Sequence, residues 1–279
     1  MIVFFNDKFI EEEDAVARVK NRGMYFGEGI FETMRAENGN IIFLQQHLSR
    51  FLSSAGFFSL PVSYTFDELR TIIITLLHKN SLADATVRIT LNGGVLQAGE
   101  NFSSRPTSSL LYIETKHYTR TFPEESAICF ASFPLLHGDK LRLHKTTQCL
   151  RNIVEARAAY DRGFDEVIFT DEQLHILEGS RTNIFLIREN KILTPSHVCG
   201  ILPGVMRNVI AEICSEHSLL FEERIILRNE IEEADEIFLT NAVNGVVPVK
   251  ALENKRYEKN ERTSALQHYL HEKKRRTMP

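Results

Sequence analysis

The sequence contains no tryptophan, only 4 cysteines in 279 residues, and no excess of positive charge. The cysteines stand at positions 129, 149, 199 and 214, without a Cys-x-x-Cys pair and without histidines at metal-ligand spacing. The sequence therefore predicts neither a zinc site nor a disulfide framework. Lys and Arg number 33 against 37 Asp and Glu, so no overall positive field attracts nucleic acid or an anionic membrane.

Long apolar segments are also missing. No run approaches the roughly 20 residues that a membrane-spanning helix needs. The amino terminus reaches a charge at Asp7 and has neither a basic start nor a small-residue cleavage site. We therefore expect a cytoplasmic protein without nucleic-acid or membrane partners. The 43% of hydrophobic residues suffices for a core in one large or two medium domains.

The first part of the chain has the pattern of hairpins followed by helices. Asn38-Gly39 separates two apolar segments and predicts a tight hairpin, because both residues tolerate positive φ. Alternation and helical spacing predict strands over 2–5, 29–36, 41–43, 86–92 and 110–114, and helices over 44–56 and 67–78. We expect an α+β domain over residues 1–117, followed by a polar connection over 118–125 that contains Pro123.

Beyond this connection the strand content rises. Turn residues bound apolar segments that predict strands over 127–131, 166–170, 183–187, 192–194, 236–240 and 246–249, and helical spacing predicts helices over 149–161, 205–217 and 263–272. This pattern predicts a second, larger domain over residues 126–279, with a barrel-like mixed sheet decorated by helices. The expected fold class of the whole chain is α+β.

Pro203-Gly204, followed by an amphipathic pattern, predicts the start of a helix. The first N–H groups of a helix are unpaired, and its dipole favours an anion such as phosphate. An ordinary helix start is the alternative, because most helix starts bind nothing.

Two other side chains have a possible chemical role and a plainer alternative. Glu178 stands in Glu-Gly-Ser-Arg-Thr-Asn, between two apolar segments, where a solvated turn carboxylate is the ordinary interpretation. Lys145 would ordinarily be a surface amine. It gains chemical interest only where burial or a neighbouring cation favours the neutral amine, as a Schiff-base lysine requires.

Taken in order, these segments resemble the class IV aminotransferases, the fold-type IV group of pyridoxal-phosphate enzymes. The resembling motifs are Tyr25-Phe-Gly-Glu-Gly-Ile-Phe-Glu-Thr33, His47-Leu-Ser-Arg50, the lysine at 145, Glu178-Gly-Ser-Arg-Thr-Asn183, Leu202-Pro-Gly-Val-Met-Arg207 and Thr240-Asn241. The resemblance implies a homodimeric, two-domain enzyme that uses pyridoxal 5'-phosphate.

The resemblance also implies a role for each matching residue. Lys145 would form the Schiff base with the cofactor and shuttle the proton of the substrate, and Glu178 would face the pyridine nitrogen. Leu202 would pack against the cofactor ring. The groups expected on the phosphate are the side chain of Arg50, the N–H groups of Val205 and Met206, and Thr240 and Asn241.

Phe31 and Thr33 match the motif that lines the substrate pocket in this family. They are two residues apart on a predicted strand, so they share one face of it. The alternative is that both face the core. Glu32 lies on the opposite face of the strand and is expected outside the pocket.

Within the family, the chain most resembles the 4-amino-4-deoxychorismate lyases, which release pyruvate and form 4-aminobenzoate in folate biosynthesis. Three features carry this expectation: Thr33, Leu91-Asn92 where aminotransferases often place a carboxylate-binding Arg, and the Pro-Val element that ends at Val249. A substitute for that Arg is expected at Arg88 or in the 93–105 loop.

Two alternatives stay open. A branched-chain or D-amino-acid aminotransferase would use the same Lys145 chemistry. A cofactor-binding protein without activity is the other, and the presence of both Lys145 and Glu178 argues against it.

Overall fold

The computed structural model describes residues 1–258 and 260–277, and this chain divides into two compact units. The first unit contains Met1–Thr119 and Lys145–Gln148, and the second contains Arg120–His144 and Cys149–Arg276. The short segment that begins at Lys145 therefore groups with the first unit, whereas the sequence placed this lysine in the second domain. Helices and two sheets together confirm the expected α+β class.

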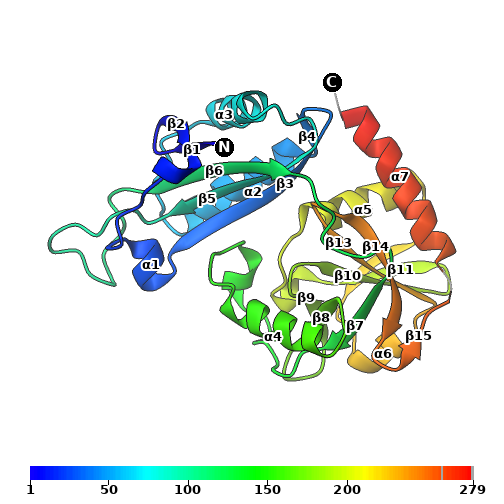
Figure 1. Cartoon of the computed structure of the whole chain (residues 1–279). Coiled ribbons are helices and arrows are strands. Elements are labelled where there is room, and N and C mark those ends of the chain that lie inside the picture. Colours follow the sequence, from blue (N-terminus) through cyan, green and yellow to red (C-terminus); the bar gives the residue numbers. More distant parts are fainter. Residues whose placement is uncertain (259, 278–279) are drawn as a thin grey trace. The chain divides into compact units, whose positions relative to one another are not determined.

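The first unit is built on a six-stranded antiparallel sheet, one face of which is covered by two helices (Figure 1). In spatial order the strands are β2 (Lys8–Glu11), β1 (Ile2–Phe5), β6 (Leu110–His117), β5 (Ala85–Asn92), β3 (Gly29–Glu37) and β4 (Asn40–Ile41). The covering helices are α2 (Leu44–Phe57) and α3 (Phe66–Lys79), and the short helices are η1 (Glu12–Asp14) and α1 (Arg22–Phe26).

Local sequence explains most of these elements. Asn38 and Gly39 take positive φ values of 51° and 77° in the β3–β4 turn, which confirms the predicted hairpin. Thr65 and Glu68 form a capping box at the start of α3. The strand predicted over 41–43 is shorter than expected, because Phe43 adopts the left-handed conformation that begins α2.

The second unit holds a nine-stranded mixed sheet. Its main path runs through β12 (Phe221–Arg224), β11 (Lys191–Pro195), β10 (Asn183–Arg188), β13 (Glu236–Asn241), β14 (Gly245–Leu252), β7 (Ser126–Phe130), β8 (Glu166–Thr170) and β9 (Ile176–Gly179), and β15 (Lys255–Arg256) pairs with β14. Strands β9 and β10 also contact each other, so the sheet curls into a half-barrel, as the sequence predicted. The helical elements are η2 (Lys140–Leu143), α4 (Leu150–Asp161), η3 (His197–Cys199), α5 (Val205–Glu216), α6 (Arg228–Glu232) and α7 (Glu261–Thr277).

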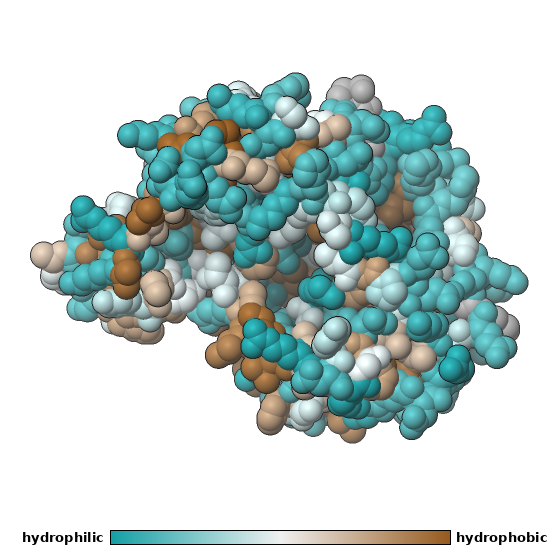
Figure 2. Space-filling view, viewed as in Figure 1, coloured by the Kyte–Doolittle hydropathy of each residue, from teal (hydrophilic) through white to brown (hydrophobic). Residues whose placement is uncertain are grey.

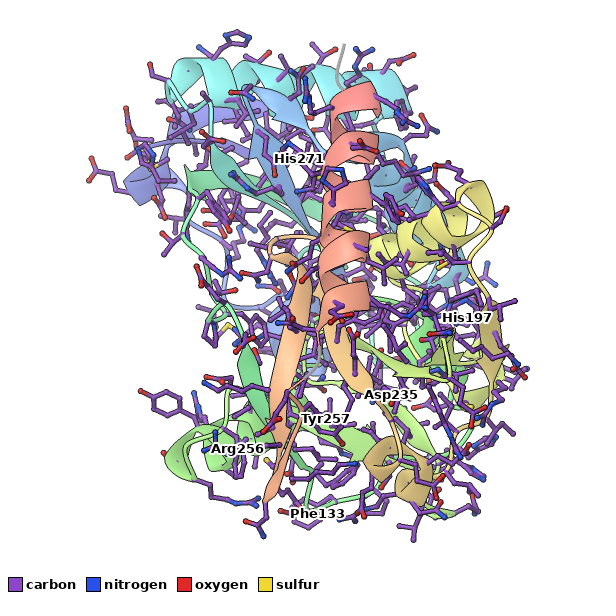
Figure 3. All side chains as sticks on the ribbon, turned by 90° about the vertical axis from the view of Figure 1, so that its right-hand side faces the viewer. Phe133, His197, Asp235, Arg256, Tyr257 and His271 are labelled. Atoms are coloured by element: carbon purple, nitrogen blue, oxygen red, sulfur yellow. The ribbon has the colours of Figure 1, made fainter. Side chains whose placement is uncertain are left out.

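Most strands of this sheet are buried on both faces, which explains their continuous apolar runs. Helix α7 is anchored at its start, where Glu236 of β13 accepts hydrogen bonds from the N–H and hydroxyl of Thr263 at 2.9 and 2.7 Å. Figure 3 shows α7 lengthwise, together with Tyr257, whose hydroxyl donates to the carbonyl of Ile231 at 2.9 Å. None of the described helices is both long enough and apolar enough to cross a membrane.

Helix α4 carries an exposed apolar surface. Its buried residues are Glu155 and Ala159, whereas Ile153 and Tyr160, which helical spacing places on one face, are 42% and 79% exposed. Apolar side chains accordingly gather over α4 in Figure 2. Helical spacing therefore located this helix correctly, but it did not show which face is buried.

Candidate active site

Lys145 is held by backbone pairing to the start of β3. The N–H of Phe31 donates to the carbonyl of Lys145 at 2.9 Å, and the N–H of Thr147 donates to the carbonyl of Gly29 at 2.9 Å. A side chain at Gly29 would bring its Cβ within 2.9 Å of the Thr147 hydroxyl, so glycine allows this close approach. The pairing places the Lys145 amine 4.7 Å from the centre of the Phe31 ring.

Phe31 and Thr33 lie on the sheet face that the helices leave uncovered. Both are half-buried, whereas Ile30 and Met34 on the other face belong to the core. The alternative that Phe31 and Thr33 face the core is therefore wrong. Thr33 pairs with Arg88 across the sheet, and the Arg88 guanidinium carbon lies 3.8 Å from the centre of the Phe31 ring.

This face of the first unit therefore combines a lysine amine, a guanidinium, a hydroxyl and an aromatic ring. A guanidinium binds a carboxylate through paired, charge-assisted hydrogen bonds. An amine beside it can attack a carbonyl or move a proton. Together these groups can accept an anionic substrate and act on it.

Arg50 lies on the other face of the sheet, in a buried cluster with Glu32 and His47. Its Nε and one terminal nitrogen donate to the two carboxylate oxygens of Glu32 at 2.6 and 2.8 Å, and Nδ1 of His47 lies 2.8 Å from the same carboxylate. The side chain of Glu32 is only 1% exposed.

The charge state of Glu32 follows from its neighbours. Burial by itself raises the pKa of Glu32, but the positive charge of Arg50 and the hydrogen bonds from His47 and Arg50 outweigh it and lower the pKa to about 2. Glu32 is thus ionised and fixes the guanidinium of Arg50. Sequence reasoning expected Glu32 outside the pocket and did not predict its ion pair, although a glutamate at a core-facing strand position needs such a partner.

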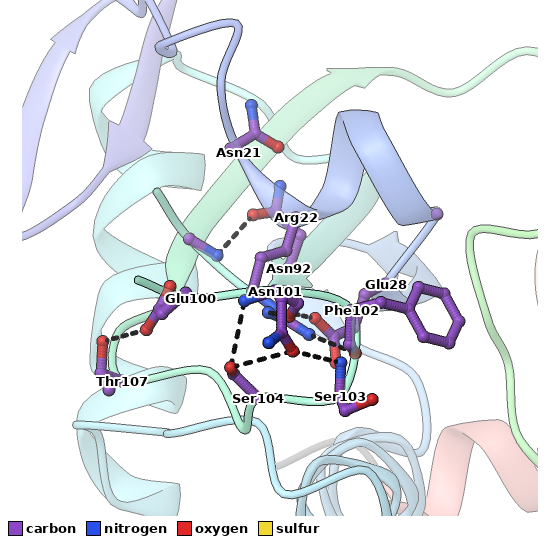
Figure 4. Close-up of polar contacts among 12 residues, drawn as sticks. Asn21, Arg22, Glu28, Asn92, Glu100, Asn101, Phe102, Ser103, Ser104 and Thr107 are labelled. Carbon is purple, nitrogen blue, oxygen red and sulfur yellow. Dashed lines mark hydrogen bonds and ion pairs between the residues drawn. The ribbon is translucent and has the colours of Figure 1, made fainter. Parts of the chain in front are cut away.

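The loop over residues 93–105 is organised by Arg22 (Figure 4). Arg22 is buried, pairs with Glu28, and donates to the carbonyl of Asn101 at 3.0 Å. Asn101 in turn accepts a hydrogen bond from the N–H of Ser103 at 2.9 Å, which closes the loop on itself. Arg22 is thus committed to holding the loop, and Arg105 is exposed. Of the places considered for a substitute carboxylate-binding group, Arg88 is the one beside Phe31 and Thr33.

In the second unit, Glu178 lies near the end of β9 and is 8% exposed. Its carboxylate accepts hydrogen bonds from Arg142 at 2.5 Å, from the N–H of Leu202 at 3.0 Å and from Asn183 at 3.4 Å. The interpretation as a solvated turn carboxylate is therefore wrong. Sequence reasoning missed Arg142, because the short 3-10 helix η2 that contains it has no recognisable sequence pattern.

Asn183 joins this carboxylate to the start of α5. Its amide donates to the carbonyl of Leu202 at 3.0 Å, and its oxygen would lie 1.9 Å from a Cβ at residue 204, so only glycine fits there. Helix α5 follows with Gly204 as its N-cap and without a side-chain cap. The N–H groups of Val205 and Met206 thus begin a helix whose N-cap residue, a glycine, has no side chain that could accept their hydrogen bonds.

Thr240 lies next to this helix start, because it pairs with Asn183 across strands β10 and β13. Its hydroxyl is buried and has no hydrogen-bond partner among the described residues. Leaving such a group unsatisfied costs roughly 1–3 kcal/mol. The unpaired hydroxyl and the uncapped helix both fit a bound phosphate, which accepts hydrogen bonds at several oxygens.

The side chains of Asn241 and Arg207 also hold neighbouring segments of the second unit together. The side-chain oxygen of Asn241 accepts the N–H groups of Val243 and Asn244 at 3.0 and 2.8 Å, so it shapes the turn between β13 and β14. Arg207 is fully buried and donates to the carbonyl of Pro195 at 2.8 Å and to Nε2 of His197 at 2.8 Å. Arg207 therefore connects α5 to the end of β11, which contains Pro195, and to η3, which contains His197.

Comparison with known proteins gives consistent matches. Residues 29–252 match the family described as amino-transferase class IV. A D-alanine aminotransferase of Staphylococcus epidermidis is 28% identical, over 90% of this chain and 89% of the relative. A branched-chain-amino-acid aminotransferase of Pseudomonas aeruginosa is 26% identical, over 91% of this chain and 86% of the relative.

Solved structures are similar along nearly the whole chain. A protein of Legionella pneumophila, provisionally assigned as a 4-amino-4-deoxychorismate lyase, has a TM-score of 0.89 at 26% identity, over 94% of this chain and 97% of that one. A branched-chain aminotransferase of Thermoproteus uzoniensis has a TM-score of 0.91 at 25% identity, over 97% and 93% of the two chains.

Proposed function

Because the chain belongs to the class IV aminotransferase family, whose members are pyridoxal-phosphate-dependent enzymes, we propose that it binds pyridoxal 5'-phosphate and acts on the amino group of a carboxylate-bearing substrate. The observation that carries the cofactor assignment is the buried hydroxyl of Thr240, which has no hydrogen-bond partner in the part of the chain that the structure describes and lies next to the uncapped start of α5. When bound, the cofactor supplies an aldehyde for covalent attachment and an electron sink for the substrate carbon.

The proposed phosphate ligands come from several elements. They are the N–H groups of Val205 and Met206, the Thr240 hydroxyl, Asn241 through its amide nitrogen, and Arg50. Glu32 supports this role of Arg50, because it fixes the guanidinium by two hydrogen bonds. Leu202 is the residue proposed to pack against the cofactor ring.

Glu178 is proposed to face the pyridine nitrogen and to keep it protonated. The carboxylate suits this task because Arg142, Leu202 and Asn183 fix its position. Arg142 is thus a positioning residue that acts through Glu178. Lys145 would hold the cofactor through its amine, and the same amine would carry the proton at the substrate carbon.

The substrate end is assigned to the uncovered sheet face of the first unit. Arg88 is proposed to bind the substrate carboxylate, with the Phe31 ring against the substrate and the Thr33 hydroxyl as a hydrogen-bond donor. The position where aminotransferases often carry an Arg offers no such group here. Leu91 is buried in the core, and Asn92 accepts the N–H of Gly94 at 3.1 Å.

Our first candidate reaction is that of 4-amino-4-deoxychorismate lyase, in which Lys145 removes the ring proton and pyruvate leaves. Thr33 and the absent Arg favour it, and the Legionella structure supports it. Amino-acid transamination is the second candidate, because the sequence relatives named above are aminotransferases. Both reactions need the same lysine and carboxylate and differ in the leaving group.

A direct assay separates the two reactions. The purified protein is given 4-amino-4-deoxychorismate, and 4-aminobenzoate and pyruvate are measured. In parallel it is given D-alanine or a branched-chain amino acid with 2-oxoglutarate. Product only in the first assay supports the lyase, and keto-acid exchange without 4-aminobenzoate refutes it. Lys145→Ala should abolish either activity, whereas Lys116→Ala, which removes an exposed lysine of the same unit, should not.

A further inference from the structure

Three potential metal ligands meet in the second unit, outside the residues assigned to the cofactor. His137 and His175 place their Nδ1 atoms beside the same carboxylate oxygen, Oδ2 of Asp171, at 2.6 and 2.8 Å. Ligand atoms of the three residues all lie within 4.8 Å of one another. The sequence predicted no metal site, because His137 is 34 residues from Asp171 and belongs to no spacing motif.

Hydrogen bonds of the backbone hold these ligands in place. Asp171 is fully buried, and its Oδ1 accepts the N–H groups of Gln173 and His175 at 2.9 and 2.8 Å. This turn directs Oδ2 toward both imidazoles. The segment that carries His137 is held beside the end of β8, where the N–H of Leu135 donates to the carbonyl of Thr170 at 2.8 Å.

The donor set suits zinc. Two imidazole nitrogens and one carboxylate oxygen match the ligands of Zn²⁺, whereas Mg²⁺ and Ca²⁺ prefer oxygen alone. Zinc bonds of about 2.0–2.2 Å set neighbouring ligand atoms about 3.4 Å apart, so each imidazole must move by roughly 0.7 Å. His137 and His175 are 34% and 20% exposed, which gives an ion access, and water can fill the fourth position.

We propose that His137, Asp171 and His175 bind one Zn²⁺ ion per chain. The ion takes the place of the hydrogen bonds between the two imidazoles and Asp171, and it joins the segment before η2 to the turn between β8 and β9. Arg142 lies in η2, so the ion stabilises the segment from which Arg142 reaches Glu178. Its role is structural, and it supplies no group to the reaction.

Metal binding tests the proposal independently of activity. The cofactor-loaded protein is stripped with a chelator and desalted, and Zn²⁺ binding is measured by calorimetry. We expect one ion per chain. We also expect His137→Gln and His175→Gln each to weaken Zn²⁺ binding at least about tenfold, because even the mutation of a residue that only hydrogen-bonds to a metal ligand typically lowers the metal affinity by this factor. His268→Gln is the matched control, because His268 also pairs with a carboxylate, Glu272, but is 68% exposed on α7. It should leave binding unchanged.

A second measurement uses the unaltered protein, in case a variant fails to fold. Diethyl pyrocarbonate modifies accessible imidazoles, and peptide mass spectrometry locates the modified residues. Zn²⁺ should protect His137 and His175 and leave His268 reactive. The proposal is overturned when the protein binds no Zn²⁺, when both glutamine variants bind it as well as the parent, or when Zn²⁺ leaves the reactivity of His137 and His175 unchanged.

Discussion

The buried carboxylate of Glu32 gives the sharpest stability prediction. We expect Glu32→Gln to destabilise the first unit strongly at pH 7, because it leaves the cation of Arg50 without its counter-charge. The amide also presents an N–H group to the guanidinium, which can only donate. Breaking a buried ion pair by removing one partner typically costs 3–5 kcal/mol.

The pKa of Glu32 in the structure gives the size of the expected destabilisation. The pKa of Glu32 falls from its ordinary value of 4.5 to about 2, and one pKa unit corresponds to about 1.4 kcal/mol, so the ionised form stabilises the fold by about 3 kcal/mol. No discount for solvent screening applies, since the side chain is 1% exposed. A lowered pKa in the folded state means that this stability is complete above pH 4.5 and is lost as the pH falls from 4.5 toward 2.

Native-state hydrogen exchange of peptides from β3 and α2 is the suitable assay, because a two-unit chain need not unfold in one step. The control is Glu37→Gln on the same strand, whose carboxylate is 24% exposed and lies 3.8 Å from Arg35. We expect the control to cost less than about 1 kcal/mol. Equal losses in both variants, or an unchanged pH dependence between 4.5 and 2 in Glu32→Gln, would refute the reasoning.

Further predictions concern the cofactor, the substrate and the pH response. Thr240→Val should leave the cofactor-free protein as stable as the parent or about 1 kcal/mol more stable, because it removes a hydroxyl that has no partner among the described residues. The same substitution should weaken cofactor binding about tenfold, as measured by equilibrium dialysis. Arg88→Gln should raise KM on the order of 10- to 100-fold in steady-state kinetics, with the cofactor still bound. Burial and the charge of Arg207 lower the pKa of His197 in the folded protein. The stability of the fold should therefore fall as the pH drops below 6.5, and thermal unfolding of His197→Gln should show a smaller loss.

The elements that the sequence predicted well are those set by local rules. Asn38-Gly39 can adopt the positive φ of a hairpin turn, and the apolar spacing of residues 44–56 produced α2 nearly to the residue. The alternation in β5 separated the core residues from Arg88 and Thr90. Each of these depends on neighbours in the chain, so a single sequence contains the needed information.

The contacts that build the site depend on distant partners, and the sequence could not show them. Glu178 is buried because Arg142 and Leu202 bring donors to it, and nothing near residue 178 reports these partners. Lys145 was placed in the second domain, yet its carbonyl pairs with Phe31 of the first unit. The resemblance supplied both residues as candidates, and the structure supplied the contacts that hold them.

The attachment site of the cofactor tests the central claim most directly. The protein is incubated with pyridoxal 5'-phosphate, desalted, reduced with borohydride and digested, and the modified peptide is identified by mass spectrometry. We predict one adduct per chain, at Lys145, and none in Lys145→Ala. Absence of an adduct, or modification spread over exposed lysines such as Lys116, would contradict the account.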